Sequence, residues 1–223
     1  EERLDIAAAL QKTTEVLVRN IIEHYLEQHP SKNLCLSGGV CLNSVMSGKM
    51  FDWFEGKVKN IYMCPVPYDA GLAIGSAQWV WHQELDNPRI TWNTSASPYL
   101  GELYDTKIIK ESLEKYKDKI SVLKVGDEKV IDLLDKQNII SVFGGGSESG
   151  RRALGNRSIL ADPRSPAMKD LINEKVKHRQ WYRPFAPAIL REDVKDWFVR
   201  DISSPYMGFV IKFKEEAKEK VPA

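Results

Sequence analysis

Apolar and polar positions divide the first part of the chain into helices and strands. Apolar residues recur at helical spacing over residues 2–28. Two short apolar runs, 33–37 and 60–66, predict buried strands, and helical spacing after each predicts helices at 40–54 and 71–85. Because strands that alternate with helices form parallel sheets, we expect an α/β unit with a largely parallel sheet flanked by helices.

A second α/β unit is predicted to begin near residue 105. The preceding stretch, "DNPRITWNTSASPYLGEL", is rich in Pro, Asn, Ser and Thr and has no periodicity, which is typical of a domain boundary. Beyond it, amphipathic patterns predict helices in "TKIIKESLEKYKDK" and "DEKVIDLLDKQN", and apolar runs predict strands in "ISVLKV" and "IISVFGGG". Two further helices are expected at 166–178 and 191–199.

Composition excludes some classes of partner. The 223 residues include 32 basic and 31 acidic side chains, so no overall basic field attracts nucleic acid. No apolar run reaches transmembrane length, so no membrane partner is expected. Three cysteines without metal-ligand spacing favour a reducing cytoplasm. The chain also begins without Met, inside a helical pattern, and is interpreted as a piece of a longer protein.

The segment Ser37-Gly38-Gly39 lies where a strand turns toward a helix and has two interpretations. Glycine reaches backbone conformations that other residues avoid, so the pair could serve only a sharp turn. A helix N-terminus also carries N–H groups that attract phosphate, and glycine leaves room for it. The segment alone does not decide between them.

Glycines and cations are concentrated in "GGGSESGRRALGNRSILADPR", residues 144–164, which holds five glycines and four arginines. Backbone N–H groups and guanidinium groups both bind phosphate or carboxylate oxygens. The composition therefore predicts an anion pocket, against the alternative that these arginines form surface ion pairs. Further cations follow downstream: Lys175, Lys177, Arg179 and Arg183.

Several familiar motifs are absent. The chain has no G-x-x-x-x-G-K-[ST] phosphate loop, and "GGGSESG" does not fit the dinucleotide-binding pattern. Its four histidines form no H-x-x-x-H pair.

Four segments, in this order and spacing, resemble the carbamoyltransferase family: "SGGVCLN", "PVPYDAGLAIGSA", "ESGRRALGNRSILADPR" and "VKHRQWYRPFAPAIL". This family contains the nodulation carbamoyltransferases and the antibiotic O-carbamoyltransferases. The resemblance implies the C-terminal part of an actin-like ATPase-fold domain at 1–86, similar to the tRNA threonylcarbamoyl-transferring proteins. A linker at 87–104 and an incomplete YrdC-like domain at 105–223 would follow.

The resemblance also implies an activity. The YrdC-like module would form carbamoyladenylate from carbamoyl phosphate and ATP with Mg²⁺, and the actin-like module would transfer the carbamoyl group to a hydroxyl of a sugar or antibiotic. This chain in isolation is not expected to catalyse carbamoyl transfer. Two alternatives are a tRNA threonylcarbamoyl-transfer protein, which the neutral charge disfavours, and a nucleotide-binding regulatory module without catalysis. A homodimer is left open.

Site residues follow from the same resemblance. Asp69 would be the carboxylate ligand of Fe(II) or another divalent metal, although Asp at this position also suits a helix N-cap. The nucleotide site of the first module would comprise Ser37, Gly38, Gly39, Val40 and Asn43. The second module would bind carbamoyl phosphate through Arg152, Lys177, Arg179 and Arg183, assisted by Asn156 and Ser158.

The chain departs from the family pattern at two positions of the glycine-rich stretch. Gly146 stands where arginine is common, and Arg151 where proline is common. One cation is therefore lost and another gained five residues later. Downstream, Gln180 replaces a common glutamate.

Overall fold

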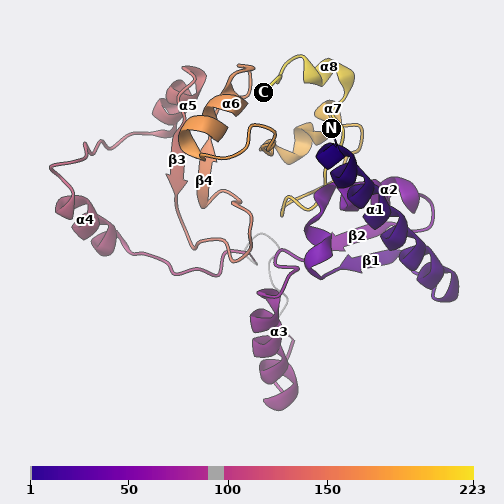
Figure 1. Cartoon of the computed structure of the whole chain (residues 1–223). Helices are drawn as coiled ribbons and strands as arrows, with labels where there is room; N and C mark the ends of the chain where they lie inside the picture. Colours follow the sequence, from indigo (N-terminus) through magenta and orange to yellow (C-terminus); the bar gives the residue numbers. More distant parts are fainter. Residues whose placement is uncertain (1, 90–97) are drawn as a thin grey trace. The chain divides into compact units, whose positions relative to one another are not determined.

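The computed structural model describes residues 2–89 and 98–223, which form two compact units (Figure 1). The first unit contains residues 2–89 together with Ser204–Ile211, and the second contains residues 98–203 and Lys212–Ala223. The predicted linker, 87–104, includes residues 90–97, which lie outside the described residues. Both units are mixed α/β.

The first unit follows the predicted alternation of helices and strands. The strands β1 and β2 pair in parallel, with Leu34 opposite Ile61. The predicted helix at 40–54 is divided, because Asn43 caps a new helix after a single 3₁₀ turn. The elements are α1 (Glu2–Gln28), β1 (Asn33–Leu36), η1 (Gly39–Leu42), α2 (Ser44–Trp53), β2 (Asn60–Met63), α3 (Gly71–Trp79) and the π-helical η2 (Val80–Glu84).

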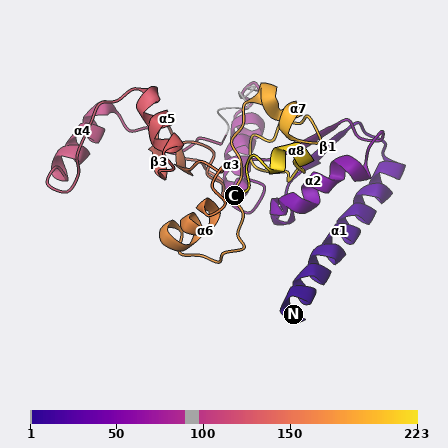
Figure 2. The same ribbon diagram turned by 90° about the horizontal axis from the view of Figure 1, so that it is seen from above.

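The core of this unit lies between α2 and the sheet. Met46, Met50 and Phe54 from α2 and its C-cap are at most 1% exposed and pack with Leu36 and Met63 of the strands. Figure 2 shows α1 running beside α2. One face of α1 supplies the partly buried side chains that complete this cluster, Val18, Ile22 and Leu26.

The segment Ser204–Ile211 returns to the first unit and packs on α2. The amide of Val210 donates to the carbonyl of Ser44 over 3.0 Å. A Cβ atom placed on Gly48 would lie 2.1 Å from the carbonyl oxygen of Val210, so only glycine allows this close approach. No hydrophobic pattern in the sequence predicted this contact.

The second unit differs from the prediction at three points. The expected strand at 120–125 is wrong: these residues are exposed and belong to neither sheet. Instead, β3 pairs in antiparallel register with a strand inside the arginine-rich stretch, Phe143 opposite Arg157. The predicted helix at 191–199 ends early, because Phe198 pairs across an antiparallel bridge with Phe213.

The elements of the second unit are short. None of the helices in the described part of the chain is long and apolar enough to cross a bilayer. The elements are α4 (Thr106–Lys115), α5 (Asp127–Asp135), β3 (Ile140–Phe143), β4 (Arg157–Leu160), α6 (Met168–Leu171), the π-helical η3 (Ile172–Val176), η4 (Arg191–Asp193), α7 (Val194–Trp197) and α8 (Glu215–Lys218).

Candidate functional site

The predicted nucleotide-binding turn lies at the carboxyl edge of the parallel strands, where ligands of open α/β sheets bind. Gly38 has φ +99°, a conformation that requires glycine, and its amide donates to the carbonyl of Pro67 from the loop after β2. The Cβ position of Gly39 is 3.9 Å from Cβ of Tyr68 in the same loop. The two loops therefore meet at one edge, with Ser37 and Val40 exposed on the turn.

Asn43 anchors this turn to α1. Its Oδ1 accepts from the amide of Met46, which makes it the N-cap of α2, and its Nδ2 donates to Oε1 of Gln11 over 2.7 Å. Gln11 in turn donates to Glu15, whose buried carboxylate binds Nζ of Lys49 over 2.7 Å. Both ends of the Asn43 carboxamide thus have protein partners. Neither Gln11 nor Glu15 was predicted from the sequence to support this turn.

Hydrogen bonds hold Glu15 ionised. Burial raises its pKa, but the bonds from Lys49 and Gln11 outweigh burial and leave the pKa below its ordinary value. The ionised carboxylate joins α1 to α2 through its ion pair with Lys49, next to the turn.

Asp69 is exposed in the loop after β2, close to the predicted nucleotide turn. The interpretation of its side chain as a helix cap is wrong, because α3 begins at Gly71 after Ala70, with no side-chain cap. The carbonyl of Asp69, rather than its carboxylate, accepts from the amide of Leu72. Among the described residues, no group of three or more His, Cys, Asp or Glu side chains is placed to hold a metal ion.

The glycine-rich stretch folds around the carboxylate of Glu148. Its Oε1 accepts backbone N–H groups of Leu154 at 2.7 Å, Asn156 at 2.9 Å and Arg157 at 3.3 Å. Burial raises the pKa of Glu148, but these hydrogen bonds lower it by more, so the pKa lies below its ordinary value. An internal carboxylate therefore occupies a cluster of donors that composition alone would offer to an external anion.

Two of the four arginines in this stretch, Arg157 and Arg164, bind groups of the same unit. Arg157 donates through Nη1 to the carbonyl of Gly144 at 2.6 Å, and its guanidinium lies 3.6 Å from the centre of the Phe143 ring. Arg164 pairs with Asp162 and Asp135, and these carboxylates raise its pKa. The ion-pair alternative therefore holds for Arg164, whereas Arg157 is held by carbonyl groups and an aromatic ring.

The other predicted side chains of this stretch lie in the loop and in β4. Nδ2 of Asn156 donates to the carbonyl of Gly146 over 2.7 Å, and Oγ of Ser158 accepts from the amide of Gly155 over 2.9 Å. Arg152 is half-buried and has interaction partners of its own.

The last residues of the predicted linker line this loop. The amide of Gly101 donates to the carbonyl of Ser147, and the hydroxyl of Tyr99 donates to the carbonyl of Leu154. A Cβ atom on Gly146 would lie 2.7 Å from the Gly101 carbonyl oxygen and 2.8 Å from that of Tyr99. This packing explains glycine at a position where the family resemblance implied arginine.

The remaining predicted cations lie on a loop organised by Asn173, a residue that is 1% exposed. Its Oδ1 accepts from Nε of Arg179 at 2.7 Å, and its Nδ2 donates to the carbonyl of Arg183 at 3.0 Å. Lys177 directly follows η3, and its amide donates to the carbonyl of Ile172. The Asn173 carboxamide thus binds the guanidinium of Arg179 and the main chain of Arg183, and Lys177 lies at the start of the same loop.

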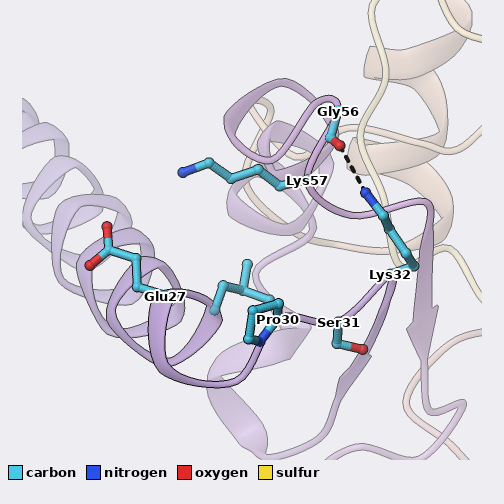
Figure 3. Close-up of a pocket in the computed structure, with 7 residues that line it drawn as sticks. Glu27, Pro30, Ser31, Lys32, Gly56 and Lys57 are labelled. Carbon is cyan, nitrogen blue, oxygen red and sulfur yellow. Dashed lines mark hydrogen bonds between the residues drawn. The ribbon is translucent and has the colours of Figure 1, made fainter.

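A surface pocket of about 350 Å³ lies elsewhere in the first unit, between the end of α1 and the turn before β2 (Figure 3). Its rim carries Lys32, whose Nζ donates to the carbonyl of Gly56 over 3.2 Å. The pocket opens at the start of β1, whereas the predicted nucleotide turn follows its end. The residues that line the pocket include none of the predicted site residues.

Two family comparisons cover most of the chain. The sequence model of the carbamoyltransferase N-terminus matches residues 1–78, and that of the carbamoyltransferase C-terminus matches residues 131–223. The chain belongs to the carbamoyltransferase family. The loop that carries Lys177, Arg179 and Arg183 (the cationic loop) and the glycine-rich stretch around Glu148 lie within the C-terminal match. The nucleotide turn and Asp69 lie within the N-terminal match.

Full-length relatives extend the comparison. An uncharacterized protein of Synechocystis sp. is 40% identical over 98% of this chain and 36% of its own length. Nodulation protein NolO of Bradyrhizobium diazoefficiens is 34% identical over 96% of this chain and 40% of its own length. Nodulation protein NolNO of Sinorhizobium fredii is 33% identical over 98% of this chain and 32% of its own length. The chain thus spans between about a third and two fifths of the length of these relatives.

Proposed function

We propose that this chain is part of an O-carbamoyltransferase that uses carbamoyl phosphate and ATP to carbamoylate a hydroxyl group of a sugar or natural product. The observation that carries the proposal is the loop of Lys177, Arg179 and Arg183 around Asn173, inside the carbamoyltransferase C-terminal match. Three cations on one loop suit a doubly charged phosphate better than a neutral ligand.

In the proposed reaction, water releases phosphate from carbamoyl phosphate and leaves carbamate. A carbamate oxygen then attacks the α-phosphorus of ATP, carbamoyladenylate forms, and pyrophosphate leaves. An acceptor hydroxyl finally attacks the carbamoyl carbon, loses its proton, and releases AMP. The three cations would bind the phosphate and carbamate oxygens and offset their charge, which fixes the carbamate near the nucleotide.

The two units would divide this work. We assign residues 1–86 to an actin-like ATPase-fold domain and 105–223 to an incomplete YrdC-like domain that forms the adenylate with Mg²⁺ and ATP. The turn of Ser37, Gly38 and Gly39 would contact nucleotide at the carboxyl edge of β1 and β2. A metal does not fit the described residues alone, because Asp69 supplies a single carboxylate there.

Substitution of Lys177 tests the proposal in the full-length protein. The side chain is exposed, so Lys177→Ala should keep the fold and the free energy of unfolding. Carbamoyl-phosphate-dependent formation of pyrophosphate and AMP should fall at least tenfold. The matched control is Lys195→Ala, an exposed lysine of α7 in the same unit. Equal product formation in the Lys177→Ala variant and the wild type would refute the anion role of the loop.

Calorimetry distinguishes the non-catalytic alternative. A carbamoyltransferase should bind carbamoyl phosphate, whereas a regulatory module should bind nucleotide alone.

A further inference from the structure

We propose that Asn173 is a positioning residue, which sets the arrangement of Arg179 and Arg183 for an oxyanion while not touching the ligand itself. This inference rests on the proposed function, because it assigns a task to the same cationic loop. Neither the family comparisons nor the sequence motifs assign a role to this residue.

Four hydrogen bonds that hold the loop involve Asn173, and the side chain of Arg183 is held separately, since its Nε donates to Oε1 of Gln180 over 3.0 Å. Nδ2 of Asn173 donates to two carbonyls, of Trp181 at 3.2 Å and of Arg183 at 3.0 Å, which uses both of its hydrogens. Oδ1 accepts from Nε of Arg179 at 2.7 Å, and the main-chain carbonyl of Asn173 accepts from the amide of Arg179 at 3.0 Å. The carboxamide is therefore saturated, and it is buried.

The backbone around Asn173 is shaped to close this loop. Residues Ile172–Val176 form a π-helical turn, in which the amide of Lys177 bonds to the carbonyl of Ile172 five residues earlier. His178 follows with φ +48°, a left-handed conformation that costs free energy in a non-glycine residue. The chain reverses there and brings residues 179–183 back over Asn173.

Arg179 is oriented while much of its guanidinium stays available. Nε is bound to Asn173, the guanidinium lies 4.7 Å from the centre of the Phe185 ring, and Nη2 reaches the carbonyl of Pro184 at 3.4 Å. Nη1 makes no hydrogen bond within the described part of the chain. A guanidinium fixed at its inner nitrogen can present its outer edge to an oxyanion without first losing rotational freedom.

Only an amide side chain can both accept from Arg179 and donate to the carbonyls of Trp181 and Arg183. Aspartate at this position would still accept from Arg179, but it offers no donors and would set a carboxylate against two carbonyl oxygens. Leucine matches the volume and supplies neither contact. Asn173→Asp should therefore release residues 181–183 while it keeps the Arg179 contact, whereas Asn173→Leu should release both.

The experiment titrates inorganic phosphate and carbamoyl phosphate into the 223-residue chain, followed by NMR of arginine Nε–H signals. We expect Asn173→Asp to weaken anion binding at least tenfold and Asn173→Leu to weaken it further. The Arg179 Nε–H signal should stay near its wild-type position in Asn173→Asp and move only in Asn173→Leu. The control is Asn138→Asp, which makes the same charge change at an exposed site with one hydrogen bond to Leu133.

The outcomes separate the two proposals. If the wild type binds the anion and Asn173→Asp binds it equally well at a lower melting temperature, Asn173 is merely structural and the inference is wrong. If the wild type binds no anion at this loop, the proposed function fails and the positioning role falls with it. If Asn173→Asp has lost its fold by circular dichroism, Asn173→Ser decides: it keeps an acceptor but has one hydroxyl donor in place of two N–H donors, and unchanged anion affinity in it overturns the inference.

Discussion

Two glycines in helices of the first unit should respond oppositely to the same substitution. In Gly48→Ala, the new methyl group would lie 2.1 Å from the carbonyl oxygen of Val210 and 3.0 Å from its carbonyl carbon. In Gly75→Ala, the methyl group would enter open space on α3. Both variants gain the same helix propensity, about 0.5–1 kcal/mol, so the difference between them isolates the contact with Val210.

The magnitude follows from the distances. The backbone at Val210 must move by about an ångström to restore a normal contact, and overpacking of this kind costs about 1–3 kcal/mol. If the bond from the Val210 amide to Ser44 breaks as well, about 1 kcal/mol is added. After the gain in propensity, Gly48→Ala should lose about 1–3 kcal/mol, whereas Gly75→Ala should gain up to about 1 kcal/mol.

Urea denaturation followed by circular dichroism gives the two free energies, and hydrogen exchange at the Val210 amide reports the local effect. Exchange at Val210 should accelerate in Gly48→Ala alone. If both variants are stabilised equally and Val210 keeps its protection, Ser204–Ile211 does not pack on α2.

The remaining predictions concern the glycine-rich loop. Glu148→Gln should lower the free energy of unfolding by about 1 kcal/mol at neutral pH, since three N–H groups exchange a charged acceptor for a neutral one. Because the folded pKa of Glu148 is lowered, its contribution is complete above the ordinary carboxyl pKa and is lost as the pH falls through the folded value. Wild type and variant should therefore converge in acid, and a constant difference in urea midpoint across pH would contradict this. Gly146→Arg should displace residues 98–101, seen as faster exchange of the Gly101 amide, and unchanged exchange there would refute the packing.

Hydrophobic periodicity predicted the first unit well because its signals are local. The 27-residue helix α1 and the two parallel strands were readable from spacing alone. The strand expected at 120–125 failed for the opposite reason: its apolar pattern suits a strand, but Leu123 is 79% exposed and none of the strands in residues 2–89 and 98–223 pairs with this segment. A strand exists only when a partner, which a local pattern does not contain, supplies the other half of its hydrogen bonds.

The site was predictable in its cations and not in what holds them. Lys177, Arg179 and Arg183 were found from composition and resemblance, whereas Asn173 and Glu148 were not assigned to the site. Both act through main-chain groups several residues away, and spacing does not mark such contacts. The available signals were weak: Asn173 is one polar residue within the helix predicted at 166–178, and Glu148 is a lone acid among glycines and arginines.

The path of the chain has a consequence for synthesis. The first unit is discontinuous, because Ser204–Ile211 joins it only after residues 98–203 have passed through the second unit. On the ribosome, the face of α2 around Gly48 therefore remains uncovered until the second unit has been translated. Domains made of one continuous segment can fold as soon as they emerge, but this one must wait for its last piece. A premature stop before residue 204 would truncate both units, because residues 204–211 belong to the first and residues 212–223 to the second.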